Sequence, residues 1–311
     1  MLFNDLPLNP NLLKGIEDLG FTSPTPVQEA AILRLIIEDR DLIGLAQTGT
    51  GKTAAFGLPM IHRIDVKNKS VQGLVIAPTR ELCVQIAKDF KAFSKYMKGL
   101  SVATIYGGAS MDKQSREIKS GAQIVVATPG RLMDMIRRRM LKINKVSYAV
   151  LDEADEMLNM GFKEDIDGIL EHTPDEKLTW LFSATMPKEV AKISKYYMKD
   201  PIEITVGSKN VGAENIEHLY YNVPERERYN AVKRILDFHP NIYGLIFCRT
   251  RRTTQDIADK LLKEGYNAAP LHGDLSQMQR DKAMEKFRDK TLQILVATDV
   301  AARGIDVNDI S

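Results

Sequence analysis

The sequence predicts an α/β protein with two parallel-sheet domains in tandem. At 311 residues, the chain is long enough for two domains that each bury a core of their own. Predicted strands and helices alternate along almost its whole length. Most strands are runs of Val, Ile, Leu and Ala with little period-two alternation, which is typical of parallel strands covered by helices on both faces.

The N-terminal segment predicts a short amphipathic helix. Asn9 is its N-cap and Pro10 its first residue, and apolar residues follow at helical spacing until Gly20 closes it. Two prolines then hold the backbone extended ahead of a second helix over residues 27–37.

A seven-strand alternation makes up most of the first predicted domain, residues 1–206. Its predicted strands are 41–46, 72–77, 101–105, 122–127, 146–151, 178–183 and 202–205. A parallel sheet of this kind binds ligands at the carboxyl ends of its strands. Functional residues are therefore expected in the loops that follow these strands.

Residues 41–53, DLIGLAQTGTGKT, pass from an apolar run through a Gly-rich loop into Lys-Thr. Compared with the phosphate-loop pattern G-x-x-x-x-G-K-[ST], only the opening Gly is replaced, by Ala46. The backbone N–H groups of such a loop form a positive concavity for a triphosphate. Lys52 would reach the β and γ phosphates, and the Thr53 hydroxyl would ligate Mg²⁺.

The predicted nucleotide contacts in this loop are Ala46, Gln47, Thr48, Gly49, Thr50, Gly51, Lys52 and Thr53. A Gly-rich turn before an ordinary helix is the alternative interpretation. The strand before the loop, the amphipathic run after it and a second site downstream favour the nucleotide site.

The second site is the segment 146–155, VSYAVLDEAD, in which a β-type run ends in carboxylates. Asp152, at the end of a buried strand, suits the role of holding Mg²⁺, and Glu153 is placed to orient or deprotonate a water. An acidic cluster is more often a solvated face. Burial of the preceding strand argues against that here, because buried carboxylates are costly without a compensating cation.

A second alternation follows a segment rich in Gly, Asn and Ser, residues 207–216, which we predict to be a linker. The second domain is predicted to span 217–311. Its predicted strands are 217–223, 242–248, 266–270 and 292–297, and its predicted helices are 225–238, 252–264 and 276–288. It has no phosphate loop of its own, so it is not predicted to be a second independent ATPase.

Taken in order, these motifs resemble those of the DEAD-box RNA helicases of superfamily 2. In the first half they are Gly20 to Gln28, Ala46 to Thr53, Pro78-Thr79-Arg80-Glu81-Leu82, Gly107-Gly108, Thr128-Pro129-Gly130-Arg131, Asp152-Glu153-Ala154-Asp155 and Ser183-Ala184-Thr185. In the second half they are Leu245 to Thr250, His272-Gly273-Asp274, Gln279-Arg280 and Ala297 to Asp306. Each motif alone is weak, but the ordered series is specific.

The resemblance implies two RecA-like domains, the second incomplete, in an ATP-dependent RNA helicase that uses ATP and Mg²⁺. Lys52, Asp152 and Glu153 would carry hydrolysis. It implies that Phe21 stacks on adenine and that the Gln28 amide reads its edge, and it adds Ser23, Gly304 and Asp306 to the nucleotide site. It also implies that Ser183 and Thr185 are bonded to Asp155, and that these three residues couple hydrolysis to closure of the two domains.

The strand-end loops offer hydroxyls, open backbone N–H groups and the charges of Arg80 and Arg131, which suit the phosphates and 2′-hydroxyls of a single RNA strand. The predicted RNA contacts are Pro78, Thr79, Arg80, Gly108, Thr128, Pro129, Gly130, Arg131, Arg249, Arg280, Thr298 and Asp299. Arg249 stands where many relatives carry Asn. As an alternative, Thr79 and Thr128 are helix caps, and we expect them to be so in part.

The C-terminus departs from the family pattern. Members of the family continue into a His-Arg-x-Gly-Arg-x-x-Arg motif that contacts the γ-phosphate, whereas this sequence stops at Ser311 before it. We therefore expect that these 311 residues are an excerpt of a longer protein, and that the excerpt itself hydrolyses ATP poorly. The two rival functions are a non-enzymatic RNA clamp or assembly factor, favoured by the missing motif, and a DNA-directed translocase, disfavoured by Gln28 and the DEAD tetrapeptide.

The composition, 44% apolar and 27% charged with a net charge of +2, is that of an ordinary soluble chain and does not decide for or against nucleic acid. No membrane span or leader is predicted, so a cytoplasmic location is expected. Cys83 and Cys248 are expected to be buried free thiols, and His272 to be a hydrogen-bonded structural residue. RNA is the expected partner, with ribosome or RNA-decay proteins as possible further partners.

Overall fold

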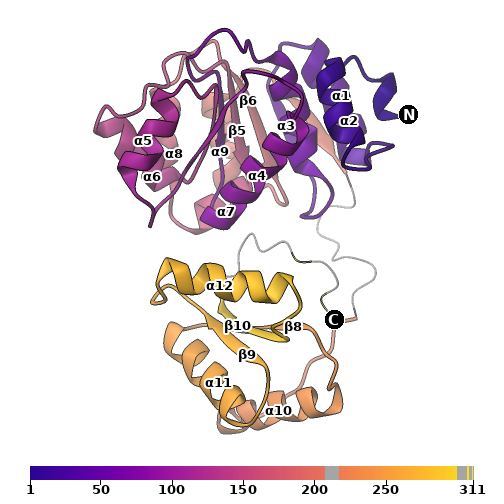
Figure 1. Ribbon diagram of the computed structural model, residues 1–311, viewed down its shortest axis with the longest axis vertical. Helices are drawn as coiled ribbons and strands as arrows, with labels where there is room; N and C mark the ends of the chain where they lie inside the picture. The colour runs from indigo at the N-terminus through magenta and orange to yellow at the C-terminus, as the bar shows by residue number, and fades with distance from the viewer. Residues whose placement is uncertain (207–216, 300–306, 308–309, 311) are drawn as a thin grey trace. The chain divides into compact units, whose positions relative to one another are not determined.

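The structure, a computed structural model, describes residues 1–206, 217–299, 307 and 310 (Figure 1). The chain divides into two compact units, Met1–Gly212 and Ala213–Ser311. The division falls inside the predicted linker 207–216, whose residues lie outside those described.

The first unit is built on a seven-stranded sheet in the order β3-β4-β2-β5-β6-β1-β7, with every pair of neighbours parallel. The strands are β1 (Leu42–Leu45), β2 (Gly73–Ile76), β3 (Val102–Ile105), β4 (Ile124–Ala127), β5 (Tyr148–Asp152), β6 (Leu178–Ser183) and β7 (Ile202–Thr205). All seven strands predicted in this unit are confirmed, as is their parallel direction.

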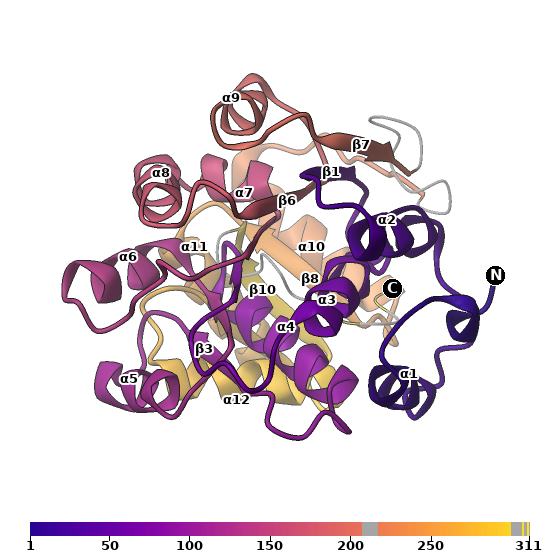
Figure 2. The same cartoon turned by 90° about the horizontal axis from the view of Figure 1, so that it is seen from above.

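Helices cover both faces of this sheet, as Figure 2 shows from above. They are α1 (Pro10–Glu17), α2 (Pro26–Ile37), α3 (Lys52–Arg63), α4 (Arg80–Phe93), α5 (Met111–Lys119), α6 (Pro129–Arg137), α7 (Ala154–Asn159), α8 (Lys163–Glu171) and α9 (Lys188–Tyr197), with a short 3₁₀ turn, η1 (Phe3–Asp5). Helices α1 to α4 pack on one face, and α6 to α9 pack on the other. Parallel strands buried on both sides explain the continuous apolar runs in the sequence.

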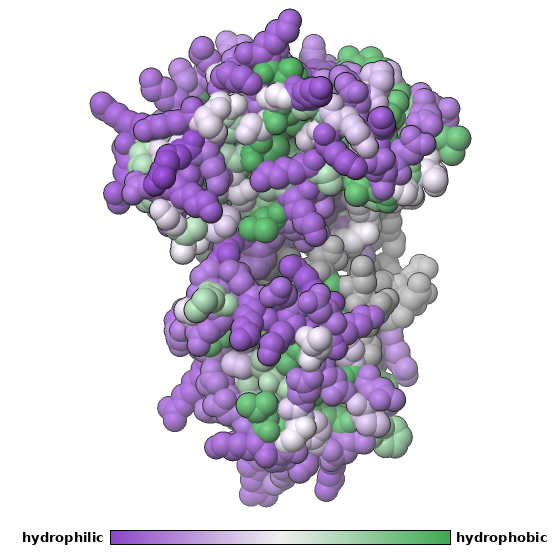
Figure 3. Space-filling view, viewed as in Figure 1, coloured by the Kyte–Doolittle hydropathy of each residue, from purple (hydrophilic) through white to green (hydrophobic). Residues whose placement is uncertain are grey.

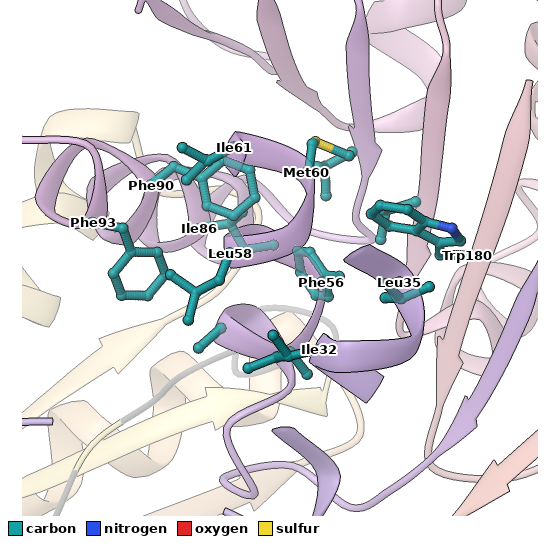
Figure 4. Packing of buried hydrophobic residues seen from close by; sticks show 14 of the residues in the cluster. Ile32, Leu35, Phe56, Leu58, Met60, Ile61, Ile86, Phe90, Phe93 and Trp180 are labelled. Atoms are coloured by element: carbon teal, nitrogen blue, oxygen red, sulfur yellow. The ribbon is translucent and has the colours of Figure 1, made fainter. Parts of the chain in front are cut away.

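The α1–α4 side of the core is rich in aromatic rings. The Phe56 ring of α3 lies 5.2 Å from that of Phe182 and 6.0 Å from that of Phe90, measured between centroids. Figure 4 shows side chains of α2, α3 and α4 gathered in this layer, with Trp180 of β6 at one side of it. Rings at these separations add attraction beyond the burial of their area.

Asp41 fixes the start of β1 and so the strand that leads into the phosphate loop. Its carboxylate accepts hydrogen bonds from the backbone N–H of Thr179 (2.6 Å) and of Lys199 (2.5 Å). Burial raises the pKa of this carboxyl, and the two N–H donors oppose that shift. The side chain therefore ties β1 to β6 and to the turn before β7.

The second unit contains a three-stranded parallel sheet in the order β8-β10-β9. Its elements are η2 (Glu225–Glu227), α10 (Arg228–Phe238), β8 (Gly244–Cys248), α11 (Arg251–Lys263), β9 (Ala268–Leu271), α12 (Gln277–Arg288) and β10 (Ile294–Thr298). These confirm three of the predicted strands and all three predicted helices, with the first helix opening in a 3₁₀ turn.

The predicted strand 217–223 is wrong. These residues have no regular secondary structure, and Tyr220 is 92% exposed. A strand is stable only when its backbone groups pair with a neighbour, and this segment pairs with none of the three described strands. The apolar and aromatic residues of this segment are typical of a strand, but without a pairing partner they do not form one.

The surface of the described residues is mainly polar, with scattered apolar side chains, as the face in Figure 3 shows. Among the described residues, no helix is long and apolar enough to span a membrane. Both cysteines are buried free thiols, as predicted, and burial raises the pKa of the Cys83 thiol well above its ordinary range.

Candidate functional site

One edge of the seven-stranded sheet gathers the loops singled out in the first half of the sequence. Because the strands are parallel, their carboxyl ends meet at the same edge. In sheet order, the loops are 106–109 after β3, 128–131 after β4, 78–80 after β2, 153–155 after β5, 184–185 after β6 and 46–51 after β1. The three loops of predicted RNA contacts are thus neighbours, and the three of predicted nucleotide and coupling residues are neighbours.

The phosphate loop lies between β1 and α3. Ala46 is buried, and its N–H donates to the carbonyl of Ser183 (3.0 Å), which joins the start of the loop to β6. Gln47, Thr48 and Gly49 are exposed, and the Thr50 hydroxyl donates to the Gln47 carbonyl (2.7 Å). One hydrogen bond therefore holds the start of the loop to β6, a second joins Thr50 to Gln47 within the loop, and residues 47–49 are exposed.

Lys52 opens α3, and its side chain is buried. Its Nζ donates to the Ala46 carbonyl (3.1 Å), across the mouth of the loop. A buried ammonium with this single described hydrogen bond keeps further N–H donors for an anion. Thr53 follows on the first turn of α3, half-buried.

Gln28 is joined to the phosphate loop. Its Nε2 donates to the Gly51 carbonyl (3.1 Å), and its Oε1 accepts from the Thr25 N–H (3.0 Å), while the Thr25 hydroxyl donates to the Thr50 carbonyl (2.8 Å). Gly51 has φ +91°, and a Cβ there would lie 2.3 Å from Gln28 Nε2, so only glycine fits. Among the described contacts, the Gln28 amide keeps one N–H and one lone pair, enough for a donor and acceptor pair with a ligand.

Asp152 and Glu153 end β5 and begin α7. Asp152 is buried, and burial raises the pKa of its carboxyl against the opposing effects of Lys52 and of the Glu153 N–H (3.0 Å). Burial, with Asp152 next in effect, raises the pKa of Glu153 to about 7. Glu153 also has φ +52°, an uncommon conformation for a non-glycine residue, at the N-cap position between β5 and α7.

Asp155 is connected to the end of β6. Its Oδ2 accepts from the Thr185 N–H (3.0 Å) and from the Thr185 hydroxyl (2.6 Å), and its own N–H donates to the Ser183 hydroxyl (3.3 Å). The structure therefore brings Asp155, Ser183 and Thr185 together, as the sequence predicted.

The fit of this edge to Mg²⁺ depends on its donor set. Among the described residues, no group of three or more His, Cys, Asp or Glu side chains could hold a metal ion. Mg²⁺ bound with a nucleotide needs only one or two protein oxygens, since phosphates and waters complete its shell. The buried Asp152 carboxylate and the Thr53 hydroxyl fit that requirement.

The loops of predicted RNA contacts are partly helix caps. Thr79 is the N-cap of α4, and its hydroxyl accepts from the Leu82 N–H (3.2 Å), which confirms the expected cap. Thr128 occupies the N-cap position of α6, but its side chain makes no cap hydrogen bond among the described residues. The expectation that Thr128 caps α6 through its side chain is wrong, because its hydroxyl bonds to neither the second nor the third N–H of the helix, although its backbone holds the N-cap position.

Two residues that the sequence did not single out hold the predicted arginines. The Arg80 guanidinium lies 4.7 Å from the centroid of the Tyr106 ring. Arg131 donates from Nη1 to the carbonyl of Ala109 (3.0 Å) and to Oε1 of Gln114 (3.1 Å). Buried Gln114 was missed because a single Gln in an amphipathic helix is usually exposed.

The predicted nucleotide contacts Phe21 and Ser23 lie in the segment between α1 and α2. Phe21 is 40% exposed, and its ring lies 6.2 Å from those of Phe3 and Phe93. The inner part of the ring is packed and the rest is accessible. Ser23 is exposed.

In the second unit, predicted residues follow two neighbouring strands. Arg249 is exposed just after β8, Thr298 ends β10, and Asp299 is exposed next to it. Arg280 is half-buried on α12. Gly304 and Asp306 lie outside the described residues.

His272 is confirmed as a structural residue. It is buried, its Nε2 pairs with Gln255 Oε1 (2.8 Å), and its Nδ1 accepts from the Asp274 N–H (3.3 Å).

Family comparisons match both units. The DEAD/DEAH box helicase family matches residues 25–193, and the helicase conserved C-terminal domain matches residues 227–311. The chain belongs to the DEAD/DEAH box helicase family. It is 46% identical, over 99% of its length, to the "ATP-dependent RNA helicase DeaD" of Mycobacterium tuberculosis. It is 43% identical, over its whole length, to the "ATP-dependent RNA helicase CshA" of Limosilactobacillus reuteri.

Solved structures of the family resemble the whole chain. A DEAD box protein from the hyperthermophile Methanococcus jannaschii is 42% identical with a TM-score of 0.65, and the match covers 100% of this chain and 83% of that one. Dbp5 of S. cerevisiae, solved bound to RNA and ADP BeF3, is 31% identical with a TM-score of 0.90, covering 100% of this chain and 79% of that one. The chain spans 54% of the DeaD relative and 62% of the CshA relative.

Proposed function

We propose that this chain is the helicase core of an ATP-dependent RNA helicase that uses ATP and Mg²⁺ to unwind or remodel RNA locally. The observation that carries the proposal is the order of loops along one sheet edge. Loops with the predicted nucleotide and coupling residues follow β5, β6 and β1. Loops with Arg131 and Arg80 follow β4 and β2, and the Gly107-Gly108 loop lies next to them after β3. The relatives named as ATP-dependent RNA helicases support it.

At the nucleotide half, Lys52 and the phosphate-loop N–H groups bind the phosphates, and Gln28 with Phe21 binds adenine. Mg²⁺, held by Asp152 and Thr53, would neutralise charge on the phosphates. Burial raises the pKa of Glu153 to about 7, so near neutral pH a large share of this carboxyl is ionised and can accept a proton from a water. Its burial beside Asp152 makes it the strongest candidate for the general base.

At the RNA half, the proposed contacts are phosphates and sugars, so binding is expected to be independent of base sequence. In the first unit, we assign RNA contacts to Thr79, Arg80, Gly108 and Arg131. Arg249, Arg280, Thr298 and Asp299 are the candidates in the second.

The link between the two halves is the Asp155 carboxylate with Thr185 and Ser183. These residues follow β5 and β6, the strands between the phosphate loop and the RNA loops. We assign them the coupling role, since Asp155 lies two residues after Glu153 and is hydrogen-bonded to Ser183 and Thr185 at the end of β6.

The test is the ATPase rate of the 311-residue chain and of a version extended C-terminally as in the longer relatives, each with RNA, DNA or no nucleic acid. RNA is expected to stimulate the extended version and DNA is not. Glu153→Gln should lower kcat by about 10²–10⁴-fold while nucleotide binding persists. Equal stimulation by DNA would overturn the choice of RNA.

RNA binding is checked by its salt dependence. The slope of log affinity against log salt should be about −0.7 per phosphate contacted, and affinities for unrelated sequences should agree. Arg80→Ala and Arg131→Ala should weaken every sequence alike. A strong preference for one sequence would point to base readout instead.

Cellular context is a separate part of the proposal. We infer a cytoplasmic location and, as further partners, proteins of ribosome assembly or RNA decay. RNA sequenced after crosslinking to the protein in cells, together with cell fractionation, tests both.

A further inference from the structure

We propose that Gln114 and Tyr106 are positioning residues that set the two RNA-binding arginines, Arg131 and Arg80, in place. The inference rests on the proposed RNA contacts and adds two residues to the site. Among the described hydrogen bonds and ring contacts, those of both residues go to the loops of predicted RNA contacts. Both act through contacts to loops at the β3, β4 and β2 strand ends.

Gln114 is 5% exposed, although it lies on α5, a helix whose other residues are largely polar. Its Oε1 accepts from Arg131 Nη1 (3.1 Å), and its Nε2 donates to the Tyr106 carbonyl (3.1 Å). A buried amide is stable only when both ends are paired, so these two bonds fix its orientation. One side chain thus joins the loop after β3 to the first turn of α6.

The loop 106–109 is held at both ends by this arrangement. Gln114 binds the Tyr106 carbonyl, and Arg131 binds the Ala109 carbonyl (3.0 Å). Between them, Gly108 has φ +81°, a left-handed conformation that glycine adopts without strain. The exposed glycines are therefore presented between two fixed points.

Arg131 remains able to bind an anion in this position. Both of its described hydrogen bonds come from Nη1, so Nε–H and the Nη2 N–H groups remain donors for a phosphate. A guanidinium already fixed in place loses less side-chain entropy when it binds.

Tyr106 connects the second arginine to the same cluster. The Arg80 guanidinium lies over its ring at 4.7 Å, and its carbonyl is the Gln114 acceptor. Rings attract guanidinium groups in this geometry through their negative faces. Arg80 and Arg131 are therefore linked through Tyr106 and Gln114, although they follow different strands.

The first test measures RNA affinity of the 311-residue chain with Gln114→Ala, Arg131→Ala and both together. Gln114→Ala should weaken binding about tenfold, and in the Arg131→Ala background it should add less than about twofold, because it acts through Arg131. In Gln114→Ala, the slope of log RNA affinity against log salt should become shallower by about 0.7. Additive losses in the double variant, or native affinity in Gln114→Ala, would overturn the inference.

Ser115→Ala is the matched control. Ser115 is the next residue on α5, is also buried, and its hydroxyl has no hydrogen-bond partner among the described residues. This variant should bind RNA like the native chain. A loss equal to that of Gln114→Ala would mean that any change in α5 disturbs the loops, and the specific role would be rejected.

Tyr106 is tested by two substitutions. Tyr106→Phe keeps the ring and should bind RNA within about twofold of native, whereas Tyr106→Leu removes it and should weaken binding about threefold or more. Equal behaviour of the two variants would refute the ring's contribution.

A readout without RNA separates this inference from the proposed function. Phenylglyoxal modification of Arg131, followed by peptide mass spectrometry, should be about threefold faster or more in Gln114→Ala and unchanged in Ser115→Ala, because a charge-assisted hydrogen bond is lost. Unchanged reactivity in Gln114→Ala would reject the positioning role. If the native chain bound no RNA, the proposed function would fail, and the Arg131 reactivity would still decide whether Gln114 holds that arginine.

Discussion

The two units have the same alternation of strands and helices but differ in how completely they bury it. In the first, helices cover both faces of seven strands, and Phe56 and Trp180 are fully buried. In the described part of the second, three strands carry a smaller core, and Phe238 and Phe247 are 80% and 58% exposed. An apolar pattern in the sequence therefore produces a buried core only where neighbouring elements cover its apolar side chains.

The largest expected effect compares one residue type in the two units. Phe56→Ala should lower the free energy of unfolding by about 3–5 kcal/mol, because it leaves a cavity among Phe90 and Phe182. Phe238→Ala should change it by less than about 0.5 kcal/mol, since the ring is mostly in water. Urea denaturation followed by circular dichroism, with Trp180 fluorescence as the probe of the first unit, measures both. Equal losses of unfolding free energy in the two variants would contradict the difference in burial between the two units.

The next effect concerns Glu153, because burying its ionised carboxylate lowers the stability of the first unit. Burial raises the pKa of this carboxyl from 4.5 to about 7, so the folded chain holds the proton more tightly than the unfolded chain. This contribution is fully favourable below pH about 4.5 and is lost as the pH rises through about 7. At pH about 8, Glu153→Gln should be more stable than native by on the order of 1–3 kcal/mol, and the difference should shrink at pH about 5.

Thermal or urea unfolding without nucleotide at the two pH values checks this. Glu164→Gln, an exposed carboxylate in the first turn of α8, is the control and should show little pH-dependent change. A difference between Glu153→Gln and native that did not depend on pH would mean that the carboxyl is not held neutral by burial.

The smallest effect tests the link at Asp155. Thr185→Val removes the hydroxyl donor to Asp155 and should cost about 0.5–1.5 kcal/mol of unfolding free energy, whereas Thr185→Ser should cost less. If the link couples the two halves, Thr185→Val should also lower RNA stimulation of ATP hydrolysis more than nucleotide affinity. Calorimetric Kd values beside steady-state rates separate these, and a parallel loss of both would argue for a purely structural bond.

Motifs with a fixed local spacing could be predicted from the sequence, and contacts made by tertiary packing could not. The phosphate loop, the end of β5 and the parallel strands of the first unit follow from periodicity and residue type. Bonds of Asp155 to Ser183 and Thr185 came from the family resemblance and are present in the structure. The roles proposed for these residues stay predictions.

The misses have a common cause. Gln114 and Tyr106 were overlooked because their importance depends on which loops lie beside α5, and sequence spacing does not record that. The strand predicted at 217–223 failed because strand formation needs a partner for its backbone groups. The side-chain cap expected at Thr128 is absent, because residue type permits a cap but does not fix the direction in which one hydroxyl turns.

The central claim is that the first unit holds an adenine nucleotide through Gln28 and Lys52. Calorimetric titration of the 311-residue chain with ADP and GDP, in native, Gln28→Ala and Lys52→Ala forms, tests it most directly. The native chain should bind ADP at least about tenfold more tightly than GDP, because the free donor and acceptor of Gln28 match adenine. Gln28→Ala should narrow that ratio, and Lys52→Ala should weaken both ligands. Equal native affinities for ADP and GDP, or full binding by Lys52→Ala, would contradict the account.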